Sequence, residues 1–531
     1  MRRILSAGDR ALLVETSDLD AAMRLHAALV GEPLDGVVEL VPAARTVLVR
    51  FDPRAVAEGD LRERLARAPV AESLARAGGV VEIPVIYDGE DLDDVAALLG
   101  VSRDELIARH QAANWRVGFA GFAPGFGYLV GDDALFDVPR RASPRTRIPA
   151  GSVALAGPYA GVYPRESPGG WQLIGRTDAE MWDVRRDPPA LLAPGARVRF
   201  VAASPSGFSD AERVRERPPA RRERTRSAHA VEIVAPGVQL TIQDLGRPGR
   251  AALGVSPSGA ADRGALRRAN RAVGNAPGEA AFEVALGGAV LRFRGPGVVA
   301  VAGASLPAAI ARPDGSARAV APEQPTAVAD GDELHLGFAT AGLRAVVAIR
   351  GGFAVEPVLG SLSTDTLGGI GPERPLAAGA VVPLRGPAAA PHAVEPGGIP
   401  AAAPLLPYEV SELRVALGPR HEWFTAAGIR TLLEQEWRVT PRSDRIGIRL
   451  AGDVALERAV AGELPSEGVV TGAIQVPPDG QPVLFLPDHP VTGGYPVIAT
   501  VIDADLDRAA QLPPGARVRF RLSGPNVGGP S

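Results

Sequence analysis

Two adjacent residues near the end of the chain, Asp488 and His489, combine a carboxylate with an imidazole. Both side chains can transfer protons at neutral pH, so the pair is a candidate for general acid–base chemistry. Neighbouring side chains on a strand point to opposite faces, so the two can serve one substrate only from a loop. Pro487 and Pro490 flank the pair and favour a loop. A purely structural turn is the alternative.

Arginines in two other segments are candidates for binding an anion. Arg145 lies in SPRTRIPAGSV beside a glycine turn, and a guanidinium fork suits carboxylate or phosphate. The segment SDRIGIRL places Asp444, Arg445 and Arg449 around a glycine. Asp444 and Arg445 alternate faces if this segment is extended, so they share a pocket only if it turns. Surface ion pairs are the alternative for these arginines.

The segment GFAPGFGYL, residues 121–129, carries three aromatic side chains among glycines and a proline. Glycine lets the backbone approach a ligand closely, and proline stiffens the turn. Phe122, Phe126 and Tyr128 would then form an apolar wall. A rigid packed corner is the alternative interpretation.

The composition excludes several mechanisms. All 57 basic residues are arginine, and the chain contains neither lysine nor cysteine. Without lysine there is no biotinyl-lysine, no Schiff base and no standard phosphate loop. Without cysteine there is no thiol nucleophile, disulfide or thiolate metal site. HExxH and GxSxG motifs are also absent, and we expect no bound metal.

Charge and hydropathy exclude two classes of partner. The formal net charge is −4, which gives no reason to expect nucleic acid or an anionic membrane surface. No stretch approaches 18 uninterrupted apolar residues, and the first residues reach Asp9 before an apolar run of signal-peptide length. We therefore expect a cytoplasmic protein.

Apolar patterns divide the chain into folded units. Residues 1–78 show a strand–helix–strand–strand–helix pattern, typical of a small α/β domain. Residues 79–203 begin with a strand and two helices and continue as short β runs broken by Gly and Pro. Similar β runs fill residues 231–385 and 408–525. Such texture predicts closed or sandwiched β domains.

Two segments between these units are expected to be linkers. Residues 204–230 are rich in arginine, and residues 386–407 are rich in Pro, Ala and Gly. A solvated linker is the favoured interpretation of both, since large apolar side chains are almost absent. A nucleic-acid-binding tail is the alternative for the first.

An internal repeat links the two outer β units. PGARVRF occurs at residues 194–200 and again at residues 514–520. A Gly-Gly-aromatic element precedes each copy, with Trp171 in the first and Tyr495 in the second. The ordered match predicts two β domains of one fold, with Trp171 and Tyr495 at equivalent positions.

Many ordered motifs carry a family resemblance. IPVIYDGEDLDDVA, GFAPGFGYL and SPGGWQLIGRT make residues 1–203 similar to allophanate hydrolase subunit 1, the Kip-type kinase inhibitor family. TIQDLGRPG, GVSPSGAAD, GSLSTDTLGGIG and GAIQVPPDGQP make residues 231–523 similar to allophanate hydrolase subunit 2. The chain resembles a fusion of these two proteins, whose bacterial counterparts are the B and C subunits of 5-oxoprolinase. Both parts also resemble the carboxyltransferase region of urea carboxylase.

The resemblance implies a mainly β protein with α+β portions, built from cyclophilin-like β-barrels and a small N-terminal α/β domain. It implies ATP-dependent opening of a lactam, 5-oxo-L-proline, to L-glutamate. The reaction would need a separate lactam-utilisation-type protein, the A subunit of 5-oxoprolinase. ATP with Mg²⁺ would bind to the complex, not necessarily to this chain, and this chain would carry no biotin.

The lactam chemistry needs an anion clamp, oxyanion donors and a base for water. We expect Arg145, Arg445 and Arg449 to clamp, and Gln475 and Tyr495 to donate hydrogen bonds. Proton transfer would fall to His489, Asp488 or Asp444, and Phe126 and Tyr128 would contact the substrate. His489, Gln475 and Asp444 are expected to line one cleft, and replacing His489 by alanine would then lower the rate about 10²–10⁴-fold.

Two other functions fit the same sequence. Carboxyl transfer to urea or another amide would require a separate biotin-bearing protein. Inhibition of a sensor histidine kinase through the first half is the other, although the fused second half argues against it.

Overall fold

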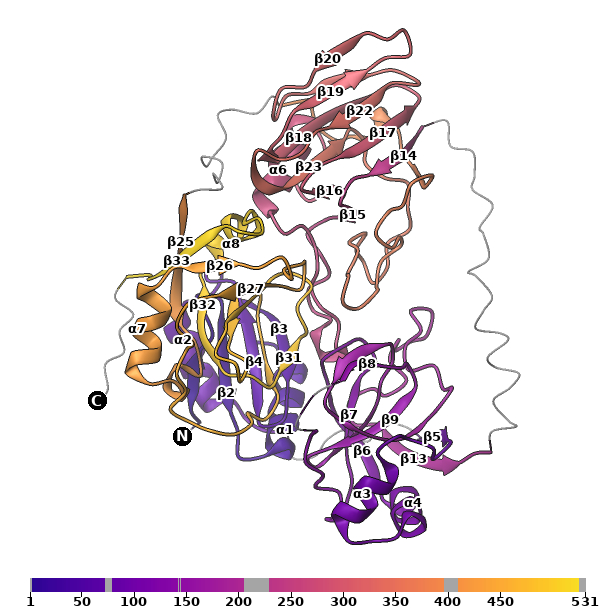
Figure 1. The fold of residues 1–531 in the computed structure, drawn as a ribbon, viewed down its shortest axis with the longest axis vertical. Helices are drawn as coiled ribbons and strands as arrows, with labels where there is room; N and C mark the ends of the chain where they lie inside the picture. Colours follow the sequence, from indigo (N-terminus) through magenta and orange to yellow (C-terminus); the bar gives the residue numbers. More distant parts are fainter. Residues whose placement is uncertain are drawn as a thin grey trace.

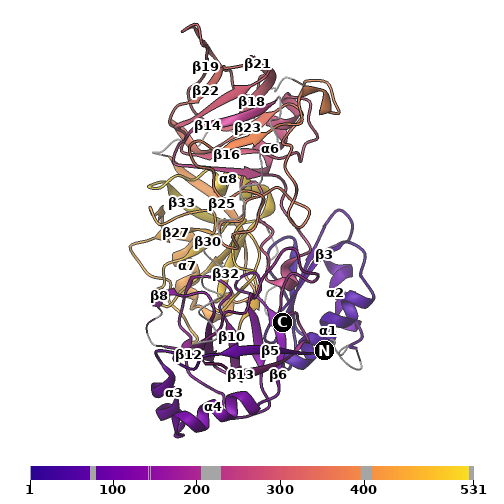
Figure 2. The same ribbon diagram turned by 90° about the vertical axis from the view of Figure 1, so that its right-hand side faces the viewer.

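The computed structural model describes residues 2–71, 79–141, 143, 145–204, 229–395 and 409–524. The linkers expected at residues 204–230 and 386–407 fall largely outside this part of the chain. The described strands form four units, which follow one another along an elongated molecule (Figures 1 and 2). The expected mainly β fold with a small N-terminal α/β domain is confirmed. No helix within the described residues is long and apolar enough to cross a membrane.

The N-terminal domain is an antiparallel sheet of order β1-β2-β4-β3 with two helices. Leu12 and Val14 pack under the helices, while Leu13, one residue between them, belongs to a cluster shared with the C-terminal barrel. The strand is buried on both faces because the sheet lies between its own helices and another domain. The elements are β1 (Ile4–Ser6), β2 (Ala11–Glu15), α1 (Leu19–Gly31), β3 (Val37–Pro42), β4 (Thr46–Phe51) and α2 (Glu58–Arg67).

The first barrel is a seven-stranded sheet of order β12-β9-β10-β7-β6-β13-β5. A bridge between Ile86 and Arg176 brings the two edges of this sheet together. Its elements are β5 (Val80–Val85), α3 (Leu92–Leu99), α4 (Arg103–Ala112), β6 (Trp115–Ala120), β7 (Gly127–Val130), β8 (Arg145–Ile148), β9 (Ser152–Ala156), β10 (Tyr159–Val162), β11 (Ser167–Gly169), β12 (Gln172–Arg176) and β13 (Arg197–Ala202).

The second barrel is closed, with strand order β25-β32-β29-β30-β27-β26-β33. Beside it, β28 and β31 form a separate two-stranded sheet. The elements are β25 (Val410–Leu417), α7 (Ala426–Glu434), β26 (Trp437–Val439), β27 (Gly447–Ala451), β28 (Glu467–Gly468), β29 (Ala473–Gln475), β30 (Val483–Phe485), β31 (Thr492–Gly493), β32 (Val497–Val501), α8 (Asp503–Ala510) and β33 (Arg517–Leu522).

The two barrels share one topology and one register, which confirms the repeat seen in the sequence. In each, the PGARVRF strand runs parallel to the first strand, with Arg197 opposite Val80 and Arg517 opposite Val410. Trp171 and Tyr495 both closely precede equivalent strands, β12 and β32. The repeated sequence therefore encodes a complete barrel.

A buried tryptophan marks the same place in both barrels. Trp115 pairs across to Val198, and Trp437 pairs across to Val518. Each indole N–H donates to a carbonyl five residues earlier, near the end of the preceding helix: to His110 at 2.8 Å and to Leu432 at 3.0 Å. The tryptophan ties the helix to the barrel because its N–H needs an acceptor when buried.

Residues 230–384 differ from the barrel we expected there. Their strands form two separate sheets, of order β20-β19-β22-β17-β14-β24 and β15-β16-β23-β18-β21. The strands are β14 (Ala230–Pro236), β15 (Gln239–Gln243), β16 (Ala281–Ala285), β17 (Ala289–Arg294), β18 (Gly297–Ser305), β19 (Ala308–Ala311), β20 (Ala317–Ala319), β21 (Thr326–Val328), β22 (Glu333–Leu336), β23 (Ala341–Ile349) and β24 (Val381–Pro383).

This unit, the sandwich domain, has one large core built from both sheets. Helix α6 (Arg263–Ala272) covers the second sheet, and Ala265 and Ala269 pack in one cluster with Ala300 and Ala302 of β18. Small side chains on both surfaces let the helix lie close to the sheet. Alternating apolar runs fit stacked and closed sheets equally well, so the pattern alone did not distinguish them.

Candidate active site at the junction of the domains

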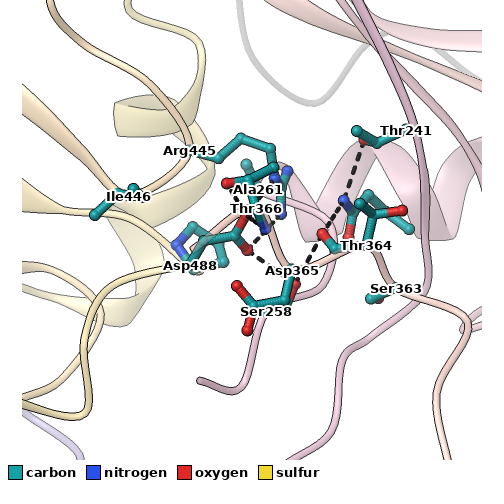
Figure 3. A network of polar contacts seen from close by, with 12 residues as sticks. Thr241, Ser258, Ala261, Ser363, Thr364, Asp365, Thr366, Arg445, Ile446 and Asp488 are labelled. Carbon is teal, nitrogen blue, oxygen red and sulfur yellow. Dashed lines mark hydrogen bonds and ion pairs between the residues drawn. The ribbon is translucent and has the colours of Figure 1, made fainter. Parts of the chain in front are cut away.

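Loops from the sandwich domain and the second barrel meet in a buried group of polar side chains (Figure 3). We name the group formed by Ser258, Asp365, Thr366, Arg445 and Asp488 the polar centre. Ser258 precedes α6, Asp365 and Thr366 follow β23, and Asp488 follows β30. These residues are far apart in sequence, and the packing of the two domains brings them together.

Asp488 accepts hydrogen bonds from every other member of the polar centre except Asp365. Its Oδ1 accepts from Ser258 Oγ at 2.8 Å, and its Oδ2 accepts from Thr366 N at 2.9 Å and Thr366 Oγ1 at 2.7 Å. Arg445 Nε and Nη2 donate to the same carboxylate at 3.0 and 3.1 Å. Burial alone would raise the pKa of Asp488, but the Arg445 guanidinium holds it below its ordinary value. Asp488 is therefore an ionised, fully engaged carboxylate.

Arg445 is completely buried and is held by the protein itself. It also forms an ion pair with Glu283 of β16 and donates to the Gly259 carbonyl at 2.6 Å. Burial lowers its pKa, while Asp488 and Glu283 raise it further, so the cation persists. We expected Arg445 to clamp a substrate anion. Its donors are instead committed to two internal carboxylates and a carbonyl, so it fixes the second barrel against the sandwich domain.

Asp365 differs from Asp488 in having a free carboxylate oxygen. Its Oδ1 accepts from Gly368 N at 2.8 Å, whereas its Oδ2 is buried without a hydrogen-bond partner among the described residues. A Cβ at position 368 would lie 2.3 Å from that oxygen, so glycine allows the close approach. Burial and the negative charge of Asp488 raise the pKa of Asp365 to about 7. Asp365 can therefore exchange a proton near neutral pH.

A second unpartnered group lies near Asp365. Arg247 is 2% exposed, and its Nε and Nη1 are buried without partners among the described residues. Its positive charge acts on Asp365. Buried polar atoms are normally paired, and unpaired ones gather where water or a ligand binds. Asp365 and Arg247 thus give this place both an acceptor and donors for a small polar molecule.

The first barrel completes the junction through the GFAPGFGYL loop. A Cβ at Gly254 would lie 2.5 Å from the Ala123 carbonyl oxygen, and one at Gly368 would lie 3.0 Å from Pro124. Arg165 of the same barrel donates to the Leu367 carbonyl. Phe122 and Ser258 have positive φ angles of 61° and 51°, which non-glycine residues seldom adopt. Such strain is typical of functional sites.

Phe126 and Tyr128 pack in an aromatic cluster with Tyr163 and Trp171 instead of lining a cavity. Tyr128 interacts with Ser466 and Thr492 of the second barrel, and Phe122 N donates to Thr492 Oγ1 at 3.1 Å. The aromatic segment is therefore a packed corner between the two barrels, the alternative that its sequence also allowed.

The other predicted anion-binding arginines lie apart from the polar centre. Arg145 forms ion pairs with Asp91 at 2.8 Å and Glu90 at 3.0 Å, all within the first barrel. Arg449 is exposed on β27. The surface ion pair that we considered as the alternative is what the structure shows for Arg145.

His489, Gln475 and Asp444 do not form the cleft that we expected. His489 stacks on Phe485 with ring centroids 5.5 Å apart, and its Nδ1 is 2.7 Å from the Pro490 carbonyl oxygen. Burial lowers the pKa of His489 to about 4, so the ring is neutral at physiological pH. It borders a small cavity with Glu39 and Arg50 of the N-terminal domain. Its ring therefore lies on the N-terminal-domain side of the loop.

Gln475 and Asp444 each serve the local backbone. Gln475 Nε2 donates to the carbonyl of Tyr495 at 3.0 Å, while the Tyr495 side chain is 42% exposed. Asp444 Oδ1 accepts from Ile446 N at 2.8 Å and Gly447 N at 3.1 Å, which closes a turn. The turn points Arg445 inward and leaves Asp444 at the surface.

Sequence reasoning placed Asp488 at the site but missed Asp365, Ser258 and Arg247. The segments that hold them, GSLSTDTLGGIG, GVSPSGAAD and TIQDLGRPG, were recognised only as family motifs. Each combines polar side chains with glycines between β runs, which is the pattern of a loop that approaches a ligand. The described residues hold no group of three or more His, Cys, Asp or Glu side chains that could bind a metal ion.

Comparison with known proteins divides the chain at the same junction. The family model "Carboxyltransferase domain, subdomain C and D" matches residues 2–192, and "Carboxyltransferase domain, subdomain A and B" matches residues 253–522. The B subunit of 5-oxoprolinase from Escherichia coli O157:H7 is 45% identical over 34% of this chain and 83% of that protein. The C subunit of 5-oxoprolinase from Escherichia coli K12 is 35% identical over 55% of this chain and 90% of that protein.

More distant and full-length matches agree. Urea amidolyase of Saccharomyces cerevisiae is 35% identical over 55% of this chain but only 16% of that protein. The crystal structure of TTHA0988 aligns with a TM-score of 0.81 and 35% identity, covering 96% of this chain and 100% of that one. This chain therefore belongs to the carboxyltransferase-domain family, and it joins a B-like part and a C-like part, each similar to the 5-oxoprolinase subunit of that letter.

Proposed function

We propose that this chain is the fused B–C component of an ATP-dependent 5-oxoprolinase, which opens 5-oxo-L-proline to L-glutamate. The observation that carries the proposal is the junction itself. The loop at residues 121–126, from the B-like part, abuts the loops that hold Asp365 and Ser258 in the C-like part. A reaction that requires both parts is best served by a site where both meet.

The chemistry of lactam opening matches the two carboxyls of the polar centre. A lactam is a poor electrophile, and phosphorylation of its carbonyl oxygen makes that oxygen a leaving group. Water then attacks the ring carbon, and a base must accept a proton from it. Asp365, with a free oxygen and a pKa raised to about 7, is suited to this role. Asp488 remains ionised beside it, and environments that separate two carboxyl pKa values support distinct roles.

The polar centre also has donors beside it. Arg247 Nε and Nη1 have no partners among the described residues, so they are free to bind the substrate carboxylate or the developing oxyanion. In this proposal Asp365 replaces His489 as the proton carrier, since His489 is neutral and its ring faces the N-terminal domain. Arg247 similarly replaces Arg445 as the anion donor.

ATP and a further protein are needed for the complete reaction. The chain has no lysine for a standard phosphate loop, and its described residues offer no cluster of metal ligands. The lactam-utilisation-type protein would therefore supply the Mg²⁺ site, and this chain alone would be inactive.

Carboxyl transfer to urea or another amide is the second candidate, because the matching family models are carboxyltransferase domains. It requires carboxybiotin from a separate protein, since this chain lacks the lysine that carries biotin. Bicarbonate dependence and a requirement for a biotin protein distinguish this reaction from lactam hydrolysis.

The test is product formation from 5-oxo-L-proline and ATP by this chain, by the lactam-utilisation-type protein, and by their mixture. We expect glutamate and ADP in equal amounts from the mixture and neither product from this chain. Bicarbonate-dependent carboxylation of urea with a biotin protein, without glutamate formation by the mixture, would assign the chain to the second function.

A further inference from the structure

A cavity of about 440 Å³ lies against the polar centre on the side of the N-terminal domain. The N-terminal domain, the segment that leads into α6, and the second barrel all contribute to its wall. Its volume lies in the range of small-molecule sites. Neither the expected clamp arginines nor His489 lines it.

The lining of this cavity is strongly cationic. Five arginines face it against two aspartates, Asp9 and Asp503. The arginines are Arg10, Arg50, Arg54, Arg263 and Arg267. Because the chain uses no lysine, every cation here is a planar guanidinium, which binds phosphate oxygens through paired N–H groups.

Four of these arginines are held in position by carboxylates. Arg10 and Arg263 share Asp503, at 2.8 and 2.7 Å. Arg50 pairs with Glu39 at 2.5 Å, and Arg54 pairs with Asp52 at 3.0 Å. A guanidinium has five N–H donors, so one such pair leaves donors for a ligand.

Two groups in the lining lack a protein partner. Arg267 is exposed on α6 and forms no ion pair or side-chain hydrogen bond within the described part of the chain. Arg10 Nε is buried without a hydrogen-bond partner there. The cavity therefore holds more positive charge and more N–H donors than its own carboxylates use.

The cavity is continuous with the polar centre through Ser258. Ser258, Pro257 and Pro487 belong to its wall, and Ser258 Oγ donates to Asp488 Oδ1 at 2.8 Å. Ser258 N donates to the Pro487 carbonyl oxygen at 3.1 Å. A ligand in the cavity would thus contact the same loops that position Asp488.

We propose that this arginine-lined cavity binds the phosphate group of a small molecule and holds it next to the polar centre. The inference rests on the proposed function for the source of the phosphate, which is either ATP or the acyl phosphate formed from the lactam. Both sources offer the same chemistry, an anionic phosphate group, to the arginines.

The experiment is calorimetric titration of the full chain, without the lactam-utilisation-type protein, at low salt. The probes are inorganic phosphate, ATP, and acetyl phosphate as a simple acyl phosphate. Arg267→Ala removes an exposed side chain and leaves the fold intact, which circular dichroism verifies. Arg271→Ala, one turn further along α6 and outside the cavity lining, is the matched control.

We expect phosphate to bind and to compete with whichever larger probe binds. Arg267→Ala should weaken that binding about tenfold, the loss of one hydrogen bond to a charged group, while Arg271→Ala changes it less than about twofold. Competition by phosphate against ATP but not acetyl phosphate, or the reverse, identifies the source.

Two results would overturn the inference: no binding of any probe, or binding that Arg267→Ala and Arg271→Ala leave equally unchanged. The proposed function fails separately. Phosphate binding with no glutamate from the mixture would reject the 5-oxoprolinase assignment and keep the cavity. Glutamate formation without phosphate binding by this chain would reject the cavity alone.

Discussion

Replacing Asp365 with asparagine tests whether the polar centre holds a carboxyl group that titrates near neutral pH. Asparagine keeps the shape of the side chain and the oxygen that accepts from Gly368 N, but it cannot ionise. Wild type and Asp365→Asn should therefore differ in how their stability depends on pH. Any constant effect of the amide group cancels when that dependence is compared.

The magnitude follows from the raised pKa. In the folded protein the pKa of Asp365 is about 7, against an ordinary value of 3.8. Between these values the unfolded chain has released the proton and the folded chain retains it, so stability falls as pH rises. Each pH unit in this window costs about 1.4 kcal/mol. Wild type should thus lose about 3 kcal/mol relative to Asp365→Asn between pH 5 and pH 7, with little further change above that.

The assay is urea unfolding of both proteins at several pH values from 5 to 8. Asp137→Asn is the control, since its exposed side chain changes its surroundings little on unfolding. A difference between wild type and Asp365→Asn that is the same at pH 5 and pH 8 would refute the reasoning. Asp365 would then be ionised throughout, and it would not be suited to accept a proton from water.

Three further predictions concern the framework around the site. Arg445→Met should destabilise the protein by about 3–5 kcal/mol in urea, because it leaves two buried carboxylates unpaired; Arg449→Met, exposed on β27, should change stability by less than about 0.5 kcal/mol. Trp115→Phe and Trp437→Phe should each cost about 1–3 kcal/mol through the lost indole hydrogen bond, and clearly unequal costs would contradict their equivalence. His489→Gln should reduce the loss of stability between pH 6.5 and pH 4, because the folded chain resists protonating this buried ring, whose pKa is lowered to about 4.

The elements of the fold were largely predictable because their signals are local. Apolar spacing located α1 and α4, and the PGARVRF repeat identified two copies of one barrel before any strand pairing was known. The closure of a sheet is not local. Residues 231–385 have the same texture as the barrels, yet their strands form two sheets.

The site was only partly predictable for the same reason. Asp488 was selected from its residue type and its proline-flanked turn, and it does lie in the polar centre. Its partners Ser258 and Thr366 are 230 and 122 residues away in sequence, so no local pattern joins them. His489 was selected with Asp488, but adjacent side chains diverge, and its ring faces the N-terminal domain.

Arginine type alone was a poor guide to anion binding. Arg145 and Arg445 are both committed to internal carboxylates. The free donors belong to Arg247, whose segment contains no second arginine pattern beyond Arg250. Whether a guanidinium is available depends on which carboxylates the tertiary structure places beside it.

The central claim is that the polar centre, where the B-like and C-like parts meet, carries out part of lactam hydrolysis. The most direct measurement is the rate of glutamate formation from 5-oxo-L-proline and ATP when the lactam-utilisation-type protein is mixed with wild type, Asp365→Asn or Asp137→Asn. We predict that Asp365→Asn lowers the rate about 10²–10⁴-fold and that Asp137→Asn matches wild type. A rate with Asp365→Asn equal to that of wild type would contradict the claim.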